Sequence, residues 1–162
     1  MLEFLEMPGH LIRRMHQISV SLFLEEVSKI GYDLTPVQFA ALVAVKNHPG
    51  IDQARLAGAI AYDRVTVGGV VNRLVQKDLL SRRVSVTDRR ARELFLTPDG
   101  EKALELIGPV LQHAQELLLN GLEAEEREIF IGLLKKATEA ANRLSRVPMR
   151  GFERTDKAGP LG

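Results

Sequence analysis

Apolar residues recur at intervals of three and four along most of the chain, the spacing of a helix with one apolar face. The first such stretch ends at Gly31, a residue that favours a helix stop. Thr35 and Pro36 form the next start signal, because threonine caps helices and proline fits the first turn. Asp52 and Asp63 can cap two more helices. This pattern predicts four helices before residue 80.

The apolar spacing changes to two between residues 81 and 96. Val84 and Val86 alternate with polar residues in one run, Leu94 and Leu96 do so in the next, and TDRR joins the two runs. This pattern predicts a two-stranded hairpin, which must rest on helices because a lone hairpin is not stable in water. A second threonine–proline signal at Thr97 then opens the first of two further helices. The expected fold is mainly α with a small β-hairpin.

Composition indicates one globular domain. The chain has 162 residues, of which 45% are apolar and 27% charged, and a chain of this length buries about two-thirds of its unfolded surface. The absence of cysteine excludes disulfides, thiolate metal sites and thiol-based redox sensing. No apolar run approaches the roughly 18 residues of a membrane span, so we expect no membrane partner and a cytoplasmic location.

Enzyme motifs are not found. The chain has no GxSxG elbow, P-loop or glycine-rich dinucleotide fingerprint, and the neighbouring Glu125 and Glu126 suit a helix start. The four histidines are scattered, and His10 and His16 lie six residues apart, so they do not share a helix face. We expect neither an enzyme, nor a metal site, nor a cofactor.

Charge is concentrated in the middle of the chain although the total is only +1. Residues 53–97 hold nine Lys or Arg against four Asp or Glu, a net charge of +5, whereas residues 1–52 and 98–162 each carry −2. Solvated basic faces are common, so the cluster alone does not establish a partner. A local positive field of this kind nevertheless attracts phosphate backbones.

The third and fourth predicted helices have the spacing of a helix-turn-helix. Such units need a small residue in the first helix and apolar residues at fixed offsets that brace the second helix for the major groove. Ala57 fits as the small residue, and Ala61 stands where a turn glycine is commoner. The apolar offsets are filled by Leu56, Ile60, Tyr62, Val67 and Val70. Together with the adjoining hairpin and the basic charge, this spacing predicts a winged helix-turn-helix.

Residues 34–100 resemble the MarR family of bacterial transcription regulators. Three pieces carry the resemblance: NRL with the following K, LL and R (Asn72, Arg73, Leu74, Lys77, Leu79, Leu80, Arg82), DRR in the wing (Asp88, Arg89, Arg90), and LT with the later G (Leu96, Thr97, Gly100). Flanking helices extend the resemblance to about residues 8–146.

The resemblance implies a homodimer that reads a near-palindromic operator on double-stranded DNA. Residues 1–146 would form a single MarR-type domain, with dimerisation helices at 8–34 and 98–146 and the DNA-binding region at 35–97; residues 147–162 would be a flexible tail. The first and last two helices carry apolar faces outside the DNA-binding region, which is consistent with a dimer lobe. Two-fold symmetry would place the recognition helices about 34–36 Å apart.

DNA contacts are expected from the fourth helix and the wing. Arg64 and Thr66 lie in the N-terminal half of the helix that enters the groove, and Arg73 lies further along, where a backbone contact or bracing of the wing is expected. Arg90 resembles the family's groove-inserting arginine, and Arg89 can take a phosphate. Asp88 either orients Arg73 or Arg90 or is simply a turn residue.

Gly68 and Gly69 depart from the family pattern, in which many members carry a hydroxyl residue followed by a long polar or basic one. Each glycine inside a helix costs about 1 kcal/mol relative to alanine and supplies no side chain for readout. Two explanations remain open: the helix backbone comes unusually close to DNA at these glycines, or specificity is carried by Arg64, Thr66 and the wing.

Many relatives release DNA when a small, often aromatic or phenolic, acid binds between the dimer lobe and the DNA-binding region. The candidate ligand-binding residues here are His10, Arg14, His16 and Phe39, with Arg13 and Tyr32 near them in sequence. Each polar candidate also has a simpler interpretation, as an interface histidine or part of a solvated face. The sequence thus predicts a DNA-binding repressor released by a small ligand; the alternative is a winged-helix module for protein–protein assembly.

Overall fold

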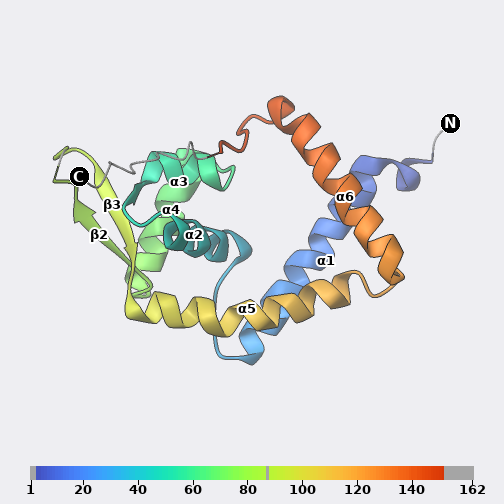
Figure 1. Ribbon diagram of the computed structural model, residues 1–162, viewed down its shortest axis with the longest axis horizontal. Coiled ribbons are helices and arrows are strands. Elements are labelled where there is room, and N and C mark those ends of the chain that lie inside the picture. The colour runs from blue at the N-terminus through green and yellow to red at the C-terminus, as the bar shows by residue number, and fades with distance from the viewer. Residues whose placement is uncertain (1–2, 87, 152–162) are drawn as a thin grey trace, which may run out of the picture.

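The structure is a computed structural model that describes residues 3–86 and 88–151 (Figure 1). Its helices are η1 (Phe4–Glu6), α1 (Pro8–Lys29), α2 (Pro36–Asn47), α3 (Gln53–Ala59), α4 (Arg64–Gln76), α5 (Pro98–Leu118), α6 (Ala124–Ala141) and η2 (Asn142–Leu144); its strands are β1 (Ile51–Asp52), β2 (Leu80–Val84) and β3 (Arg92–Leu96). The prediction of a mainly helical fold with a hairpin between the fourth and fifth long helices is confirmed.

The residues that predicted the helix starts form the expected capping hydrogen bonds. Thr35 Oγ1 accepts a hydrogen bond from the Gln38 amide at 3.3 Å, and the Gln38 side chain accepts one from the Thr35 amide at 3.1 Å, which together form a capping box at α2. Asp52 and Thr97 each cap a helix with a single side-chain hydrogen bond, accepted from the Arg55 amide in α3 and from the Gly100 amide in α5. Gly31 has a φ of +83°, so it ends α1 in the left-handed conformation that glycine adopts readily.

The predicted two-stranded hairpin is present as β2 and β3, and a short third strand that the sequence analysis did not predict joins it. β1 pairs antiparallel with β3, with Ile51 opposite Leu94, and gives the strand order β1-β3-β2. A strand of two residues is too short to show a period of two in the sequence, so only its partner reveals it. The added strand fastens the base of the hairpin to the chain between α2 and α3.

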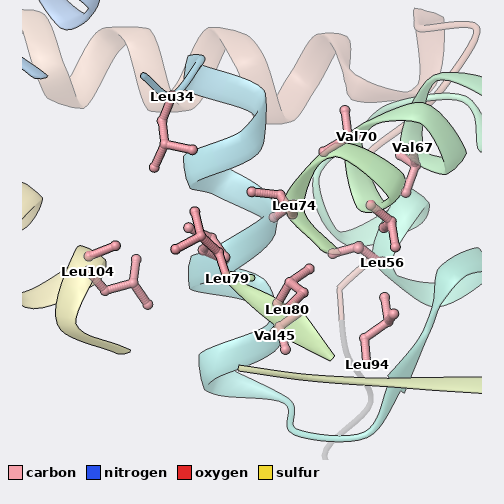
Figure 2. Packing of buried hydrophobic residues seen from close by; sticks show 14 of the residues in the cluster. Leu34, Val45, Leu56, Val67, Val70, Leu74, Leu79, Leu80, Leu94 and Leu104 are labelled. Atoms are coloured by element: carbon pink, nitrogen blue, oxygen red, sulfur yellow. The ribbon is translucent and has the colours of Figure 1, made fainter. Parts of the chain in front are cut away.

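The core lies between α2, α3, α4 and the sheet (Figure 2). The adjoining ends of α1 and α5 add Val27 and Leu104 to it. Leu42, Leu56, Leu74 and Leu80 are almost completely buried there. A fully buried leucine contributes roughly 1.5–3 kcal/mol, so these side chains hold the unit together. We call residues 36–96 the winged unit and α1, α5 and α6 the helical lobe.

The start of α5 is fixed tightly to the winged unit. The Thr97 amide donates to the Leu79 carbonyl at 3.2 Å, and the Thr97 hydroxyl donates to the Asp78 carbonyl at 2.5 Å. A Cβ added to Gly100 would lie 2.1 Å from the Leu79 oxygen, so only glycine fits this contact. The threonine and glycine of the LT…G motif therefore fix the hairpin to the lobe.

The helical lobe leads away from the winged unit (Figure 1). α1 packs along α5, whereas α6 buries none of its residues within the chain. Beyond η2 the chain returns to α3, where the Arg150 amide donates to the Gly58 carbonyl at 2.9 Å. The first part of the predicted tail, up to Gly151, is therefore held against α3, and residues 152–162 lie outside the described residues.

Candidate nucleic-acid interface

The N-terminus of α4 is organised by Asp63. One carboxylate oxygen accepts from the Thr66 amide at 2.9 Å and the other from the Thr66 hydroxyl at 2.5 Å. These hydrogen bonds lower the pKa of the Asp63 carboxyl below its ordinary value, and the bond from the Thr66 hydroxyl has the largest effect. The Thr66 hydroxyl thus donates within the cap, and its oxygen remains available only as an acceptor.

The face of α4 that points away from the core is formed by Thr66, Gly69 and Arg73. These residues lie at positions i, i+3 and i+7, which share one side of a helix, and all three are exposed. The opposite side is buried and consists of Val67, Val70, Val71 and Leu74. α4 is thus anchored by its buried apolar side, and its exposed side carries Thr66, Arg73 and the apolar Val65, with no side chain at Gly69.

The two glycines of α4 have different surroundings. A Cβ on Gly68 would lie 3.1 Å from Nε2 of Gln53 at the start of α3, so Gly68 lies where α3 and α4 pack closely. A Cβ on Gly69 would meet nothing within 4 Å. A side chain at position 68 would thus require the end of the Gln53 side chain to shift slightly, whereas no contact within the described chain restricts position 69.

The turn between α3 and α4 is tight. The Tyr62 amide donates to the Ala57 carbonyl at 3.0 Å, and Ala61 has a φ of +55°. Alanine is uncommon in this left-handed region, and glycine would adopt it without strain. Ala57 is buried at the contact, as expected for the small residue of a helix-turn-helix.

The tip of the hairpin is a turn held by Asp88. Its carboxylate accepts from the Arg90 amide at 2.9 Å, and its carbonyl accepts from the Ala91 amide at 2.9 Å. Among the described residues the Asp88 carboxylate forms no ion pair with Arg73 or Arg90. Of the two expected roles of Asp88, the structure shows that of a turn residue.

Several basic residues of the +5 segment are engaged within the protein. Lys77 pairs with Asp33 at 3.1 Å, Arg82 donates to the Asn72 side chain at 2.6 Å, and the Arg83 guanidinium lies 4.6 Å from the centre of the Phe95 ring. Arg92 donates to the Arg89 carbonyl at 3.0 Å and supports the wing turn. Arg55 also has an interaction within the protein.

The other basic residues of this segment are Arg64, Arg73, Arg89 and Arg90. All four are exposed, and across residues 3–86 and 88–151 their guanidinium groups have no hydrogen-bond or ion-pair partner. They lie at the start of α4, on its exposed side and at the wing tip. These are the four arginines that the sequence analysis selected for DNA, and the structure leaves their donors available for phosphate or base edges.

Sequence reasoning missed two of the contacts that position this surface. Arg82 and Asn72 were noted only as parts of a motif, yet their hydrogen bond joins β2 to the exposed side of α4. The pair of Lys77 with Asp33 joins the end of α4 to the segment between α1 and α2. The only sequence signal was that Arg82 follows Asn72 by ten positions, and this spacing predicts no contact unless the chain is known to reverse after α4.

The four candidate ligand-binding residues do not form one cluster within a single chain. Phe39 packs edge-on against Phe23 with ring centres 6.0 Å apart. His16 lies seven residues before Phe23 and therefore on the same side of α1, about 10 Å along its axis. His10 and Arg14 project from the other side of α1, and the His10 ring packs on Phe4.

None of the described helices is long and apolar enough to cross a membrane. The fold and the exposed arginines define a winged helix-turn-helix DNA-binding regulator with an attached helical lobe. The MarR family profile matches residues 32–91. The transcriptional repressor NicR of Pseudomonas putida is 32% identical over 135 residues, which cover 83% of this chain and 84% of NicR.

Solved structures show the same relationship. A structure of Bordetella bronchiseptica BpsR, which concerns regulation of its DNA binding by 6-hydroxynicotinic acid, has a TM-score of 0.78 and 32% identity and covers 86% of this chain and 98% of BpsR. A mutant MarR from E. coli complexed with operator DNA has a TM-score of 0.73 and 27% identity. The match covers 80% of this chain and 91% of the MarR chain. The chain belongs to the MarR family, whose members are DNA-binding transcriptional regulators that function as dimers.

Proposed function

We propose that this protein is a homodimeric repressor that reads its operator with α4 and the wing. The observation that carries the proposal is that Arg64, Arg73, Arg89 and Arg90 have no partner within the described chain, although the other basic residues of the segment do. Four such arginines on each protomer give eight in a dimer that binds one duplex. Operator DNA in a bacterial cell lies in the cytoplasm, so the proposal places the protein there.

Salt dependence tests the DNA-binding part of this proposal. The probe is a fluorescein-labelled duplex selected by the wild-type protein from a random-sequence library, and fluorescence anisotropy gives its Kd at several salt concentrations. Each neutralised phosphate lowers the slope of log affinity against log salt by about 0.9, so we expect a steep loss of affinity between about 50 and 200 mM salt. A flat response would contradict DNA binding and favour the protein–protein alternative.

Arg90→Ala tests the wing. We expect operator affinity to fall by about tenfold, because a charged contact to DNA contributes on the order of 1–3 kcal/mol. The dimer should remain intact, since Arg90 lies in the turn at the wing tip and not in a helix of the lobe. Lys135→Ala, on exposed α6, is the matched control and should leave duplex affinity unchanged. If Arg90→Ala produced monomers, our assignment of the wing would be wrong.

We further propose that a small aromatic acid releases the repressor from DNA by binding beside α1. His16 lies on the side of α1 that leads to the Phe23–Phe39 contact, so it can supply a donor to a carboxylate near an aromatic wall. The relationship to BpsR, whose structure concerns regulation by 6-hydroxynicotinic acid, supports this ligand class. His10 and Arg14 lie on the other side of α1 and could join such a site only through a second protomer.

The effector proposal is tested by titrating 6-hydroxynicotinic acid and benzoic acid into the protein–duplex complex, with cyclohexanecarboxylic acid as a non-aromatic control. We expect the aromatic acids to raise the Kd for the duplex and the control to have no effect. His16→Ala should weaken this response without changing duplex affinity in the absence of acid, and Arg14→Ala should weaken it less. Equal sensitivity of wild type and His16→Ala would remove His16 from the site.

A further inference from the structure

The segment after η2 carries two arginines to the start of the recognition helix. It leaves the lobe at Ser145, whose side chain accepts from the Val147 amide at 3.1 Å, and it reaches α3 at Arg150. Arg146 and Arg150 are both exposed. We call residues 145–150 the C-terminal arm.

The C-terminal arm is fastened at several points. The Asn142 side chain accepts from the Met149 amide at 2.8 Å and donates to the Met149 carbonyl at 2.9 Å, which closes the loop between η2 and the arm. The Arg150 amide donates to the Gly58 carbonyl at 2.9 Å. A Cβ on Gly58 would lie 3.4 Å from the Arg150 side chain. The Arg150 side chain therefore lies close over α3 at Gly58, which has no side chain of its own. The arm is therefore part of the folded surface of the winged unit.

The arm, α3 and the first turn of α4 enclose a cleft of about 150 Å³. Arg64, Arg146 and Arg150 all line it, and among the described residues none of their guanidinium groups has an ion-pair partner. Asp63 also lines the cleft, but its carboxylate accepts two hydrogen bonds from Thr66. Three cations against one engaged carboxylate leave the cleft positive. At about 30 Å³ per water, its volume is sufficient for a phosphate group.

We propose that Arg146 and Arg150 bind the DNA phosphate backbone next to the groove that α4 enters, so that the C-terminal arm extends the operator-binding surface. The inference rests on the proposed function, because Arg64 brings DNA to this cleft only if α4 reads the operator. Guanidinium groups pair with phosphate oxygens in a bidentate geometry. Contacts of this kind position the protein and carry no sequence information, so they strengthen binding to any duplex.

The test uses the full chain with Arg146→Ala and Arg150→Ala combined, on the selected duplex and on a scrambled duplex. We expect the double variant to bind both duplexes at least about tenfold more weakly, with a salt slope that falls by up to about 3.6 for four phosphates per dimer. Replacing both residues by lysine should restore most of the slope, because the charge is retained. Size-exclusion chromatography checks that the variants remain dimers.

Arg143→Ala is the matched control, because Arg143 is an exposed arginine of η2 that does not line the cleft. A double variant that binds with the same Kd and salt slope as Arg143→Ala would overturn the role of the arm while leaving the proposed function intact. A double variant that binds more tightly than wild type would show that the arm covers the DNA-binding surface and would also overturn the proposal. If the wild-type protein binds no duplex, the proposed function and this inference fail together.

Discussion

The winged unit and the helical lobe differ in how completely they bury their apolar residues. α4 of the winged unit buries Val67, Val70, Val71 and Leu74, whereas α6 of the lobe buries no residue. Ile129 and Leu133 of α6 remain about 60% exposed within the single chain. The comparison shows that the chain completes one hydrophobic core alone, and that the second core requires another copy of the lobe.

The largest expected effect breaks the completed core. Leu74→Ala should lower the free energy of unfolding by about 2–5 kcal/mol, because Leu74 is fully buried and the truncation leaves a cavity. Val65→Ala on the same helix is the control: Val65 is 87% exposed, and its truncation should change the free energy by less than about 0.5 kcal/mol. Urea denaturation followed by circular dichroism measures both. Equal effects would mean that α4 does not pack as described.

The second prediction concerns the apolar side of α6, which is exposed in the single chain and is buried only in the dimer. Leu133→Glu should convert the dimer to a monomer, because a charge buried at an apolar interface loses its hydration without gaining a partner. Operator affinity should fall by at least about 100-fold, since two linked winged units bind far more tightly than one. Analytical ultracentrifugation and anisotropy measure the two effects.

Two observations keep the Leu133→Glu experiment decisive. The circular dichroism spectrum should stay helical, because Leu133 is not part of the core of the single chain. Glu128→Gln is the control on the other side of α6 and should leave the dimer unchanged. A dimeric Leu133→Glu variant would show that this side of α6 is not the interface.

A smaller effect separates stability from readout within α4. Gly69→Ala should raise the free energy of unfolding by about 1 kcal/mol, because alanine favours a helix and the added Cβ meets nothing. If the backbone approaches DNA at Gly69, the same change should weaken operator binding. Gly68→Ala is the comparison: its Cβ would meet Gln53, so it should stabilise the protein less. Unchanged operator affinity in Gly69→Ala would leave specificity to the neighbouring side chains.

The smallest expected effect concerns the cap of α4. The pKa of Asp63 is lowered in the folded state, so the stabilisation by this carboxylate is present above its ordinary pKa and is lost as the pH falls through the lowered value. Asp63→Asn retains an oxygen for the cap but cannot be protonated, so its melting temperature should fall less steeply in acid than that of the wild type. Thermal unfolding from about pH 5 to pH 2 measures the difference. Identical slopes would show that this cap does not contribute to acid sensitivity.

Most of the fold was predictable because its signals are local. The caps at Thr35, Asp63 and Thr97 act within one helical turn, so their residue types suffice to predict them. β1 could not be predicted, since its two residues become a strand only by pairing with β3. The ligand-binding candidates on α1 were chosen by closeness in sequence, and the turn of the helix places His10 and Arg14 on the side away from Phe39.

The sequence alone determined the order of the helices, the helix-turn-helix spacing, the basic segment and the family, because each depends on residue type and position along the chain. Only the tertiary structure decided which arginines are available. The sequence had pointed to Arg64, Arg73, Arg89 and Arg90 for DNA, but it could not show that Arg82, Arg83 and Arg92 contact Asn72, Phe95 and the wing backbone. A side chain's partners are set by residues that the fold brings near, and the sequence does not state those distances.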